Sequence, residues 1–213
     1  MNMTATIKRM AGCILGALRP VIPAKVPADS SGEMLAVMFG GTRLNGQPFV
    51  IGELIAGGSG AGVATDGVDV IETDVSNCMN LPAEAMELEA PIRVLRVGLR
   101  PDSGGLGKQR GGLGIIKEYE VLHGEVRFTH RGERHMCAAQ GSDGGEPGAM
   151  AVSEIIRLSG TKETIPSKMM AVLQKGDRVV ITTAGGGGNG RAEQRDAHAA
   201  KLDLLDGKVS LSS

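Results

Sequence analysis

The sequence LRPDSGGLGKQRGGLGII, residues 99–116, decides the fold because it joins the end of an apolar strand to a turn and then to a run of glycines. Glycine has no side chain, so its backbone adopts positive φ angles and approaches other groups closely. Such a run can direct several backbone N–H groups, together with Lys108 and Arg110, at one anionic or carbonyl group. The alternative is a glycine hairpin loop in which Asp102 and Ser103 cap a turn and the two cations face water. Both interpretations stay open from these residues.

Length and charge limit the class of protein. The 213 residues suffice for one sizeable core, so we expect a single domain over residues 1–213. With 23 basic against 24 acidic side chains, the chain lacks the basic excess that binds nucleic acid or anionic lipid. Aromatic residues make up 2% of the chain, which argues against base-stacking surfaces. We therefore expect neither a nucleic-acid nor a membrane partner.

The three cysteines and the N-terminus indicate a cytoplasmic protein. Cys13, Cys78 and Cys137 are scattered and form no C-x-x-C pair, which is typical of a reducing compartment. An apolar run follows Lys8 and Arg9, but the sequence Arg-Pro at positions 19–20 ends it too early for a membrane span.

The remaining composition predicts glycine loops around an adaptable core. The 33 glycines have no collagen-like period and alternate with apolar segments, which is typical of many tight loops. Because aromatic residues are so few, Val, Ile, Leu, Ala and the 11 Met must fill the core. Met side chains are flexible and define the packing of a core poorly. We therefore expect that a partner completes this chain.

The pattern of apolar residues predicts an α+β fold: a β-rich domain with glycine-rich loops gathered at one end and a helix at each terminus. A short additional helix is expected after Pro82, and an exposed apolar surface is expected to await the partner. The predicted terminal helices cover residues 4–18 and 191–205, and the predicted strands cover residues 34–39, 49–56, 91–99, 115–122, 125–129, 150–158 and 178–183.

Several short motifs resemble nucleotide or metal sites without meeting their requirements. Residues 57–62 lack the Lys-Ser/Thr ending of a phosphate loop, and residues 185–190 fit G-x-G-x-x-G but lack an acidic ribose partner. The acidic residues between positions 66 and 74 lack EF-hand spacing. His130, His135 and Cys137 share no metal-ligand spacing. We therefore expect no metal site in this chain.

Glu84 and Glu87 are one helical turn apart after Pro82. Paired carboxylates at this spacing can serve acid–base chemistry. They are also favourable charges in the first turn of a helix. The residues alone leave both interpretations open.

Taken together, the motifs resemble the hydantoinase B/oxoprolinase family, whose members include N-methylhydantoinase, 5-oxoprolinase and the acetone and acetophenone carboxylase subunits. The matching elements, in order, are Gly57-Gly58, Asp66-Gly67, Asn77 with Asn80, Pro82-x-Glu84-x-x-Glu87, Pro91, the stretch 99–114, residues 144–148 and the glycines 185–188. The resemblance covers nearly the whole chain but only the C-terminal part of a B-type subunit. A split subunit and a truncated product both fit, and a start at Met1 with a helix favours the split subunit.

The resemblance implies an ATP-dependent hydrolase of cyclic amides. A larger A-type subunit would bind ATP and Mg²⁺ and phosphorylate the amide oxygen, and the B-type subunit would help water to open the activated ring. A complementary N-terminal B-type fragment would be a second partner and would hold a divalent metal. The small-molecule substrate is left open, since Ser59 and Gly62 stand where the family usually has Trp and Arg.

This chemistry needs cations and backbone N–H groups around the phosphorylated oxygen, and a carboxylate to activate water. The expected catalytic residues are Asp102, Arg110 and Glu84. The expected substrate-binding residues are Arg100, Ser103, Lys108, Asp66, Asn77 and Asn80.

Two other functions compete with this one. The second is a subunit of an ATP-dependent ketone carboxylase, which the same resemblance also implies, and incorporation of labelled bicarbonate, as opposed to phosphate release coupled to ring opening, would distinguish it from the first. A non-catalytic chain that only completes a larger assembly is the third hypothesis, since the composition predicts an incomplete core.

Overall fold

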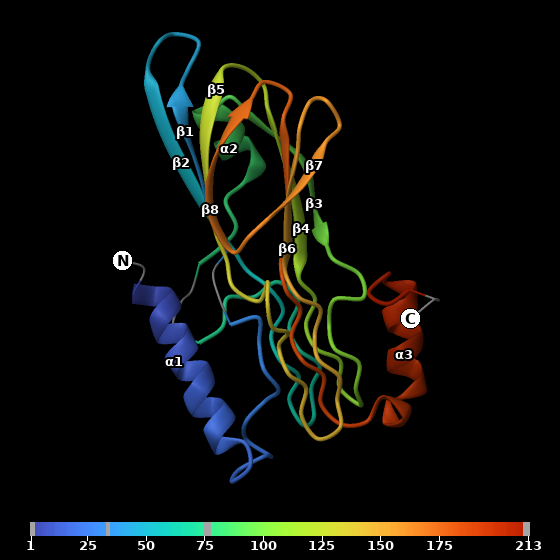
Figure 1. Ribbon diagram of the computed structural model, residues 1–213. Coiled ribbons are helices and arrows are strands. Elements are labelled where there is room, and N and C mark those ends of the chain that lie inside the picture. Colours follow the sequence, from blue (N-terminus) through green and yellow to red (C-terminus); the bar gives the residue numbers. More distant parts are fainter. Residues whose placement is uncertain (1–2, 33–34, 75–77, 211–213) are drawn as a thin grey trace.

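The computed structural model describes residues 3–32, 35–74 and 78–210, and these form two sheets above a layer of irregular segments (Figure 1). The helices are α1 (Met3–Leu18), α2 (Ala83–Glu89), the short 3-10 helix η1 (Ala192–Gln194) and α3 (Ala197–Leu205). The strands are β1 (Leu35–Thr42), β2 (Pro48–Ile55), β3 (Ile92–Leu99), β4 (Ile115–Val121), β5 (Glu125–Arg131), β6 (Val152–Ile156), β7 (Lys162–Ile165), β8 (Lys168–Gln174) and β9 (Arg178–Thr182).

Both sheets are antiparallel. The first has the strand order β2-β1-β5-β8 and the second the order β3-β4-β9-β6-β7. Along β4 and β5, buried residues alternate with more exposed ones, because successive side chains of a strand point to opposite faces. The buried faces of the two sheets pack against each other.

A side-chain core fills the space between the sheets. Phe39 of β1 lies between Tyr119 of β4 and Phe128 of β5, with both pairs of ring centroids 5.3 Å apart. A buried ion pair also crosses from sheet to sheet, because Lys117 of β4 contacts Glu53 of β2. The Tyr119 hydroxyl donates to the same carboxylate over 2.7 Å, so this polar cluster is hydrogen-bonded rather than left isolated in the core.

Glycine-rich segments form the other half of the molecule, which we call the glycine bundle: residues 56–62, 66–70, 103–114, 139–149 and 184–190. Backbone hydrogen bonds join segments that are far apart in sequence, such as Gly105 N to Gly186 O (2.8 Å) and Gly112 N to Ser59 O (2.8 Å). A Cβ added at Gly186 would overlap the carbonyl of Ser59, and one at Gly58 would overlap the carbonyl of Gly112. Glycine is therefore required here for close backbone approach.

Helix α1 lies with its polar side inward. Lys8 is completely buried and pairs with Glu72. The apolar residues that recur at helical spacing point outward instead, with exposed fractions of 46% for Ile7, 59% for Met10 and 58% for Ile14. In a helix that packs its apolar face on the core of its own chain, these side chains would be buried. The predicted exposed apolar surface is therefore present, and α1 carries part of it.

The β-rich α+β fold, the terminal helices and the gathered glycine loops are confirmed. The C-terminal helix, however, begins at Ala197 and not at residue 191. The carboxylate of Asp196 caps it by accepting from the backbone N–H groups of His198 and Ala199. Within the described residues, no helix is long and apolar enough to cross a membrane.

Candidate functional site

Arg110, the central cation of the decisive stretch, lies in a buried ion-pair network. Only 2% of the residue is exposed. Its Nε lies 3.2 Å from Asp203 Oδ1 of α3, and its Nη1 lies 3.2 Å from Asp69 Oδ1. The Asp69 carboxylate also accepts from the backbone N–H of Leu113 (2.8 Å). Arg110 therefore connects the glycine bundle to the C-terminal helix.

Arg195, which sequence reasoning did not select as a site residue, completes this network. It donates through Nη1 and Nη2 to the two carboxylate oxygens of Asp66, both at 2.9 Å, and through Nε to Asp203 (2.9 Å). We call the group Asp66, Asp69, Arg110, Arg195, Asp203 and Lys208 the Arg110 network. More than 120 residues separate Asp66 from Arg195, so no spacing rule could have paired them.

The network sets the charge state of Asp66. Burial pushes the pKa of this carboxyl up, but the hydrogen bonds from Arg195 and from the Arg110 backbone outweigh burial and hold the pKa below its usual value. Asp66 is therefore ionised at neutral pH and anchors both the Arg195 guanidinium and the backbone N–H of Arg110.

Arg100 and Ser103 hold the turn that precedes the glycines. Arg100 Nη1 donates to the carbonyls of Met150 (2.7 Å) and Thr183 (3.0 Å), and burial lowers the pKa of its guanidinium. The fully buried Ser103 hydroxyl donates to the Arg100 carbonyl (2.6 Å) and accepts from Gly114 N–H (2.9 Å). Both side chains thus bind backbone groups within the fold.

Asp102 and Lys108 are the charged residues of the stretch that are exposed. Asp102 has a positive φ of 58°, and its Oδ1 accepts from the backbone N–H of Ser210 (2.7 Å). The backbone of Lys108 bonds Gly190 (3.2 Å), while its side chain is in solvent. These two side chains are accessible to a ligand.

The other predicted site residues lie elsewhere. Glu84 is exposed on α2, which contacts β2 and β3 in the sheet half, far along the molecule from α3 (Figure 1). Asn80 lines a separate cavity of about 300 Å³ beside Glu72 and Cys78. Asn77 lies outside the described residues. The structure brings Asp66 and Arg110 together but does not bring Glu84 to them.

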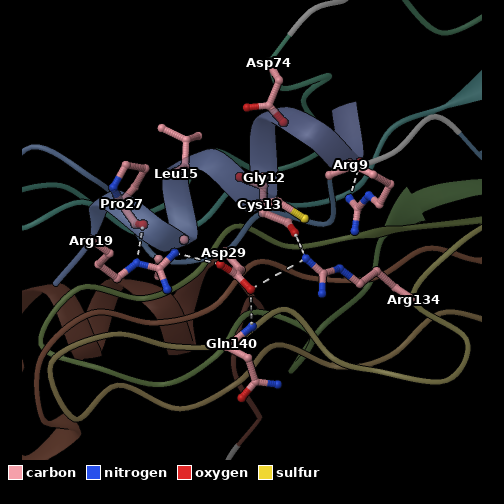
Figure 2. Close-up of a pocket in the computed structure, with 14 residues that line it drawn as sticks. Arg9, Gly12, Cys13, Leu15, Arg19, Pro27, Asp29, Asp74, Arg134 and Gln140 are labelled. Carbon is pink, nitrogen blue, oxygen red and sulfur yellow. Dashed lines mark hydrogen bonds and ion pairs between the residues drawn. The ribbon is translucent and has the colours of Figure 1, made fainter. Parts of the chain in front are cut away.

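A cavity that sequence reasoning missed lies between α1 and the segment of residues 27–32, at the edge of the glycine bundle (Figure 2). Its volume is about 380 Å³, and Arg9, Arg19 and Arg134 line it together with Asp29. Arg19 Nη2 lies 2.7 Å from Asp29 Oδ1, and Arg134 Nη2 lies 3.8 Å from Asp29 Oδ2. These residues come from separate segments of the chain, so only the fold assembles them.

Histidines form a buried contact between the sheets. His130 Nε2 of β5 lies 2.9 Å from the hydroxyl of Ser153 on β6, and the His135 ring stands edge-on to the His130 ring. Burial and the neighbouring His135 lower the pKa of His130 from 6.5 to about 4, so His130 is neutral at neutral pH. No group of three or more His, Cys, Asp or Glu side chains in the described part of the chain is arranged to hold a metal ion.

Comparison with curated proteins identifies long relatives. An uncharacterized protein of Methanocaldococcus jannaschii is 38% identical over 208 residues, which cover 98% of this chain and 36% of the relative. The putative B-type subunit of a D-/L-hydantoinase from Pseudomonas sp. (strain NS671) is 32% identical over 204 residues, which cover 94% of this chain and 34% of the relative. The chain thus spans about a third of the length of these relatives.

Two solved structures share the fold. The ATP-dependent caprolactamase from Pseudomonas jessenii matches with a TM-score of 0.75 and 23% identity over 92% of this chain and 35% of that one. Acetone carboxylase in its nucleotide-free form matches with a TM-score of 0.73 and 20% identity over 91% of this chain and 30% of that one. The family model described as hydantoinase B/oxoprolinase matches residues 1–192. The resemblance seen in the motifs is therefore confirmed, and the chain belongs to the hydantoinase B/oxoprolinase family.

Proposed function

We propose that this chain is part of the B-type subunit of an ATP-dependent hydrolase that opens cyclic amides. One observation carries the proposal: a relative named as the putative B-type subunit of a hydantoinase is 32% identical across 94% of this chain. Hydantoins and lactams share an amide inside a ring, and the caprolactamase of similar fold is named as ATP-dependent. We therefore propose a hydantoin or a lactam as the substrate class.

The chemistry has to overcome the low reactivity of an unstrained amide. Transfer of a phosphoryl group from ATP to the amide oxygen makes the ring carbon more electrophilic, so that water can add to it. The C–N bond then breaks as the ring nitrogen takes up a proton, and the resulting acyl phosphate is hydrolysed to a carboxylate and inorganic phosphate. Preorganised cations and backbone N–H groups stabilise the charge that develops on the phosphorylated oxygen. ATP with Mg²⁺ would be held by an A-type partner subunit, and a divalent metal by the B-type portion outside this chain.

Exposure divides the proposed site residues into two groups. Asp102 and Lys108 are exposed beside the glycine bundle, so they are the residues we propose to touch substrate or the activated intermediate.

Arg110 and Ser103 are buried and fully engaged inside the fold, so we propose them as positioning residues that hold the glycine segments. Arg100 and Asp66 hold the bundle in the same way, through backbone carbonyls and Arg195.

We further propose that the remaining part of the B-type fold, carried by a complementary segment or chain, covers the apolar side of α1. The exposed side chains of Ile7, Met10 and Ile14 offer a stripe at helical spacing. The relatives contain about twice as much additional sequence as this chain matches, which is enough to supply a covering domain. Met10→Glu with Ile14→Glu is expected to block this assembly without changing the stability of the isolated chain.

The function is tested in a complex reconstituted from this chain, the complementary B-type portion and an A-type subunit. With ATP, we expect ring opening of hydantoin, 5-oxoproline or caprolactam coupled to phosphate release. In that complex Lys108→Ala is expected to lower kcat by at least tenfold with an unchanged unfolding midpoint, as for loss of a charge that stabilises the transition state. Arg127→Ala, an exposed cation on the outer face of β5, is the matched control. Full turnover by both Lys108→Ala and Asp102→Ala variants in an intact complex would remove the proposed site.

A ketone carboxylase is the second candidate, because the acetone carboxylase structure matches almost as well as the caprolactamase. The same complex would then incorporate labelled bicarbonate into a ketone and leave cyclic amides intact. A complex that does neither, with all chains assembled, favours a purely structural role.

A further inference from the structure

We propose that the cavity between α1 and residues 27–32, at the edge of the glycine bundle, is a binding site for a small oxyanion, a carboxylate or a phosphate group. The cavity measures about 380 Å³, which is enough for a small organic acid. It lies apart from the Arg110 network and contains none of the site residues expected from the sequence. The inference concerns binding only, so it stands whether or not the proposed hydrolase activity is correct.

Charge is the first argument. Three guanidinium groups line the cavity, from Arg9 on α1, Arg19 just after α1 and Arg134 in the loop after β5. Two carboxylates, Asp29 and Asp74, also line it, so the lining carries an excess of positive charge. Guanidinium groups bind carboxylate and phosphate oxygens through paired, charge-assisted hydrogen bonds.

The arrangement of the arginines is the second argument. Figure 2 shows Arg19 and Arg134 reaching toward Asp29 from opposite sides, with Arg9 beside Arg134. Their other hydrogen bonds go mainly to backbone carbonyls: Pro27 for Arg19, and Ser30 and Ala138 for Arg134. Carbonyls satisfy N–H groups but do not neutralise the charge. Burial lowers the pKa of Arg134 most and the positive charge of Arg9 lowers it further, whereas Asp29 and Cys137 act in the opposite direction, so Asp29 already offsets part of the repulsion between the two cations.

An unsatisfied donor is the third argument. Nε of Arg9 is buried and has no hydrogen-bond partner among the described residues, while Nη2 of the same side chain donates to the carbonyls of Ser31 and Gly32. A buried donor without an acceptor costs free energy, since water no longer solvates it. Arg9 must rotate to present Nε to an oxyanion in the cavity, which would then supply the missing acceptor and offset the repulsion between the arginines.

The helix side of the cavity is the fourth argument. Gly12, Cys13 and Gly16 line it, and a Cβ added at either glycine would meet no atom of the described residues within 4 Å. Neither glycine is needed for close packing, yet each costs a helix about 1 kcal/mol relative to alanine. The effect of these glycines is to leave the space under α1 open.

Binding to the purified chain tests the proposal, with inorganic phosphate and glutarate as the probes at constant ionic strength. We expect one-to-one binding by isothermal titration calorimetry and a rise of the unfolding midpoint with probe concentration. Tighter binding of phosphate would identify a phosphate site, and tighter binding of glutarate a carboxylate site.

Two variants separate a built site from general attraction to a basic surface. Gly16→Leu fills the cavity and improves helix propensity, so it is expected to weaken binding by at least tenfold in a folded protein. Ala17→Leu is the matched control: it adds the same side chain one residue away at an exposed position that does not line the cavity, and it should leave affinity unchanged. Absence of binding up to about 20 mM probe, or equal affinity in all three proteins, overturns the proposal.

Discussion

The two halves of this molecule are held together by opposite means. In the sheet half, side chains such as Phe39, Phe128 and Leu173 are fully buried between two sheets. In the glycine bundle, backbone atoms of one segment contact backbone atoms of the next, and hydrogen bonds such as Gly186 N to Gly112 O (2.9 Å) replace side-chain contacts. The stability of the sheet half depends on the volume that its side chains fill, whereas the stability of the glycine bundle depends on the absence of side chains.

This difference predicts opposite responses to substitution. A side-chain core loses stability in proportion to the volume removed, because neighbours relax only in part. The glycine bundle loses stability when a single carbon is added, because backbone atoms of a hydrogen-bonded segment cannot move aside without breaking several bonds. Three experiments examine the two halves, one in the glycine bundle and two on buried polar groups of the sheet half.

Gly186→Ala is expected to have the largest effect. The added Cβ would overlap the backbone of Ser59 and lie 2.7 Å from Gly60 N, at a point where residue 186 bonds two positions of the 103–114 segment. We expect a loss of more than about 4 kcal/mol in the free energy of unfolding, measured by urea denaturation. Hydrogen exchange should show the loss of protection beginning in the bundle.

Gly98→Ala is the matched control for that substitution. Gly98 lies in β3, and a Cβ there would meet nothing within 4 Å in the described part of the chain. We expect stability to change by less than about 1 kcal/mol. Similar losses in the two variants would mean that close backbone approach does not hold the bundle together.

Glu53→Gln is expected to have the second-largest effect, because it removes one partner of the buried pair that links the sheets. Lys117 would keep a buried charge without its counter-ion, which costs about 3–5 kcal/mol. Glu89→Gln breaks an exposed pair with Arg43 (2.8 Å) and should cost less than about 1 kcal/mol. Equal urea midpoints for the two variants would contradict a role for burial in this pair.

Acid is expected to produce the smallest of the three effects, again in the sheet half. The folded state holds the pKa of His130 at about 4, below its ordinary 6.5, so the unfolded chain takes up the proton first as pH falls. Stability should therefore decrease from about pH 6.5 to about pH 4 and this contribution should level off below, with a total of about 3 kcal/mol. Urea midpoints measured across this range should fall less steeply for His130→Gln. An unchanged slope in that variant would assign the acid sensitivity to other groups.

The sequence by itself determined the family, the β-rich α+β class and the clustering of glycine segments at one end. The strands predicted over residues 115–122 and 125–129, which correspond to β4 and β5, rest on local signals, because each prediction follows from a few adjacent residues. Local signals could not indicate which distant segments would contact the glycine-rich segments.

Only the tertiary structure decided the roles of the charged residues. From the residues alone, Arg110 could either face water or point at an anionic ligand, yet the fold buries it against Asp69 and Asp203. Arg195 joins them from a segment that no spacing connects to residue 66. Lys8 is a second example: the sequence shows only a basic residue ahead of an apolar run, whereas the fold buries its side chain and pairs it with Glu72. Charges of this kind are paired by contacts between distant segments, and the free energy of burying them depends on partners that a local pattern does not contain.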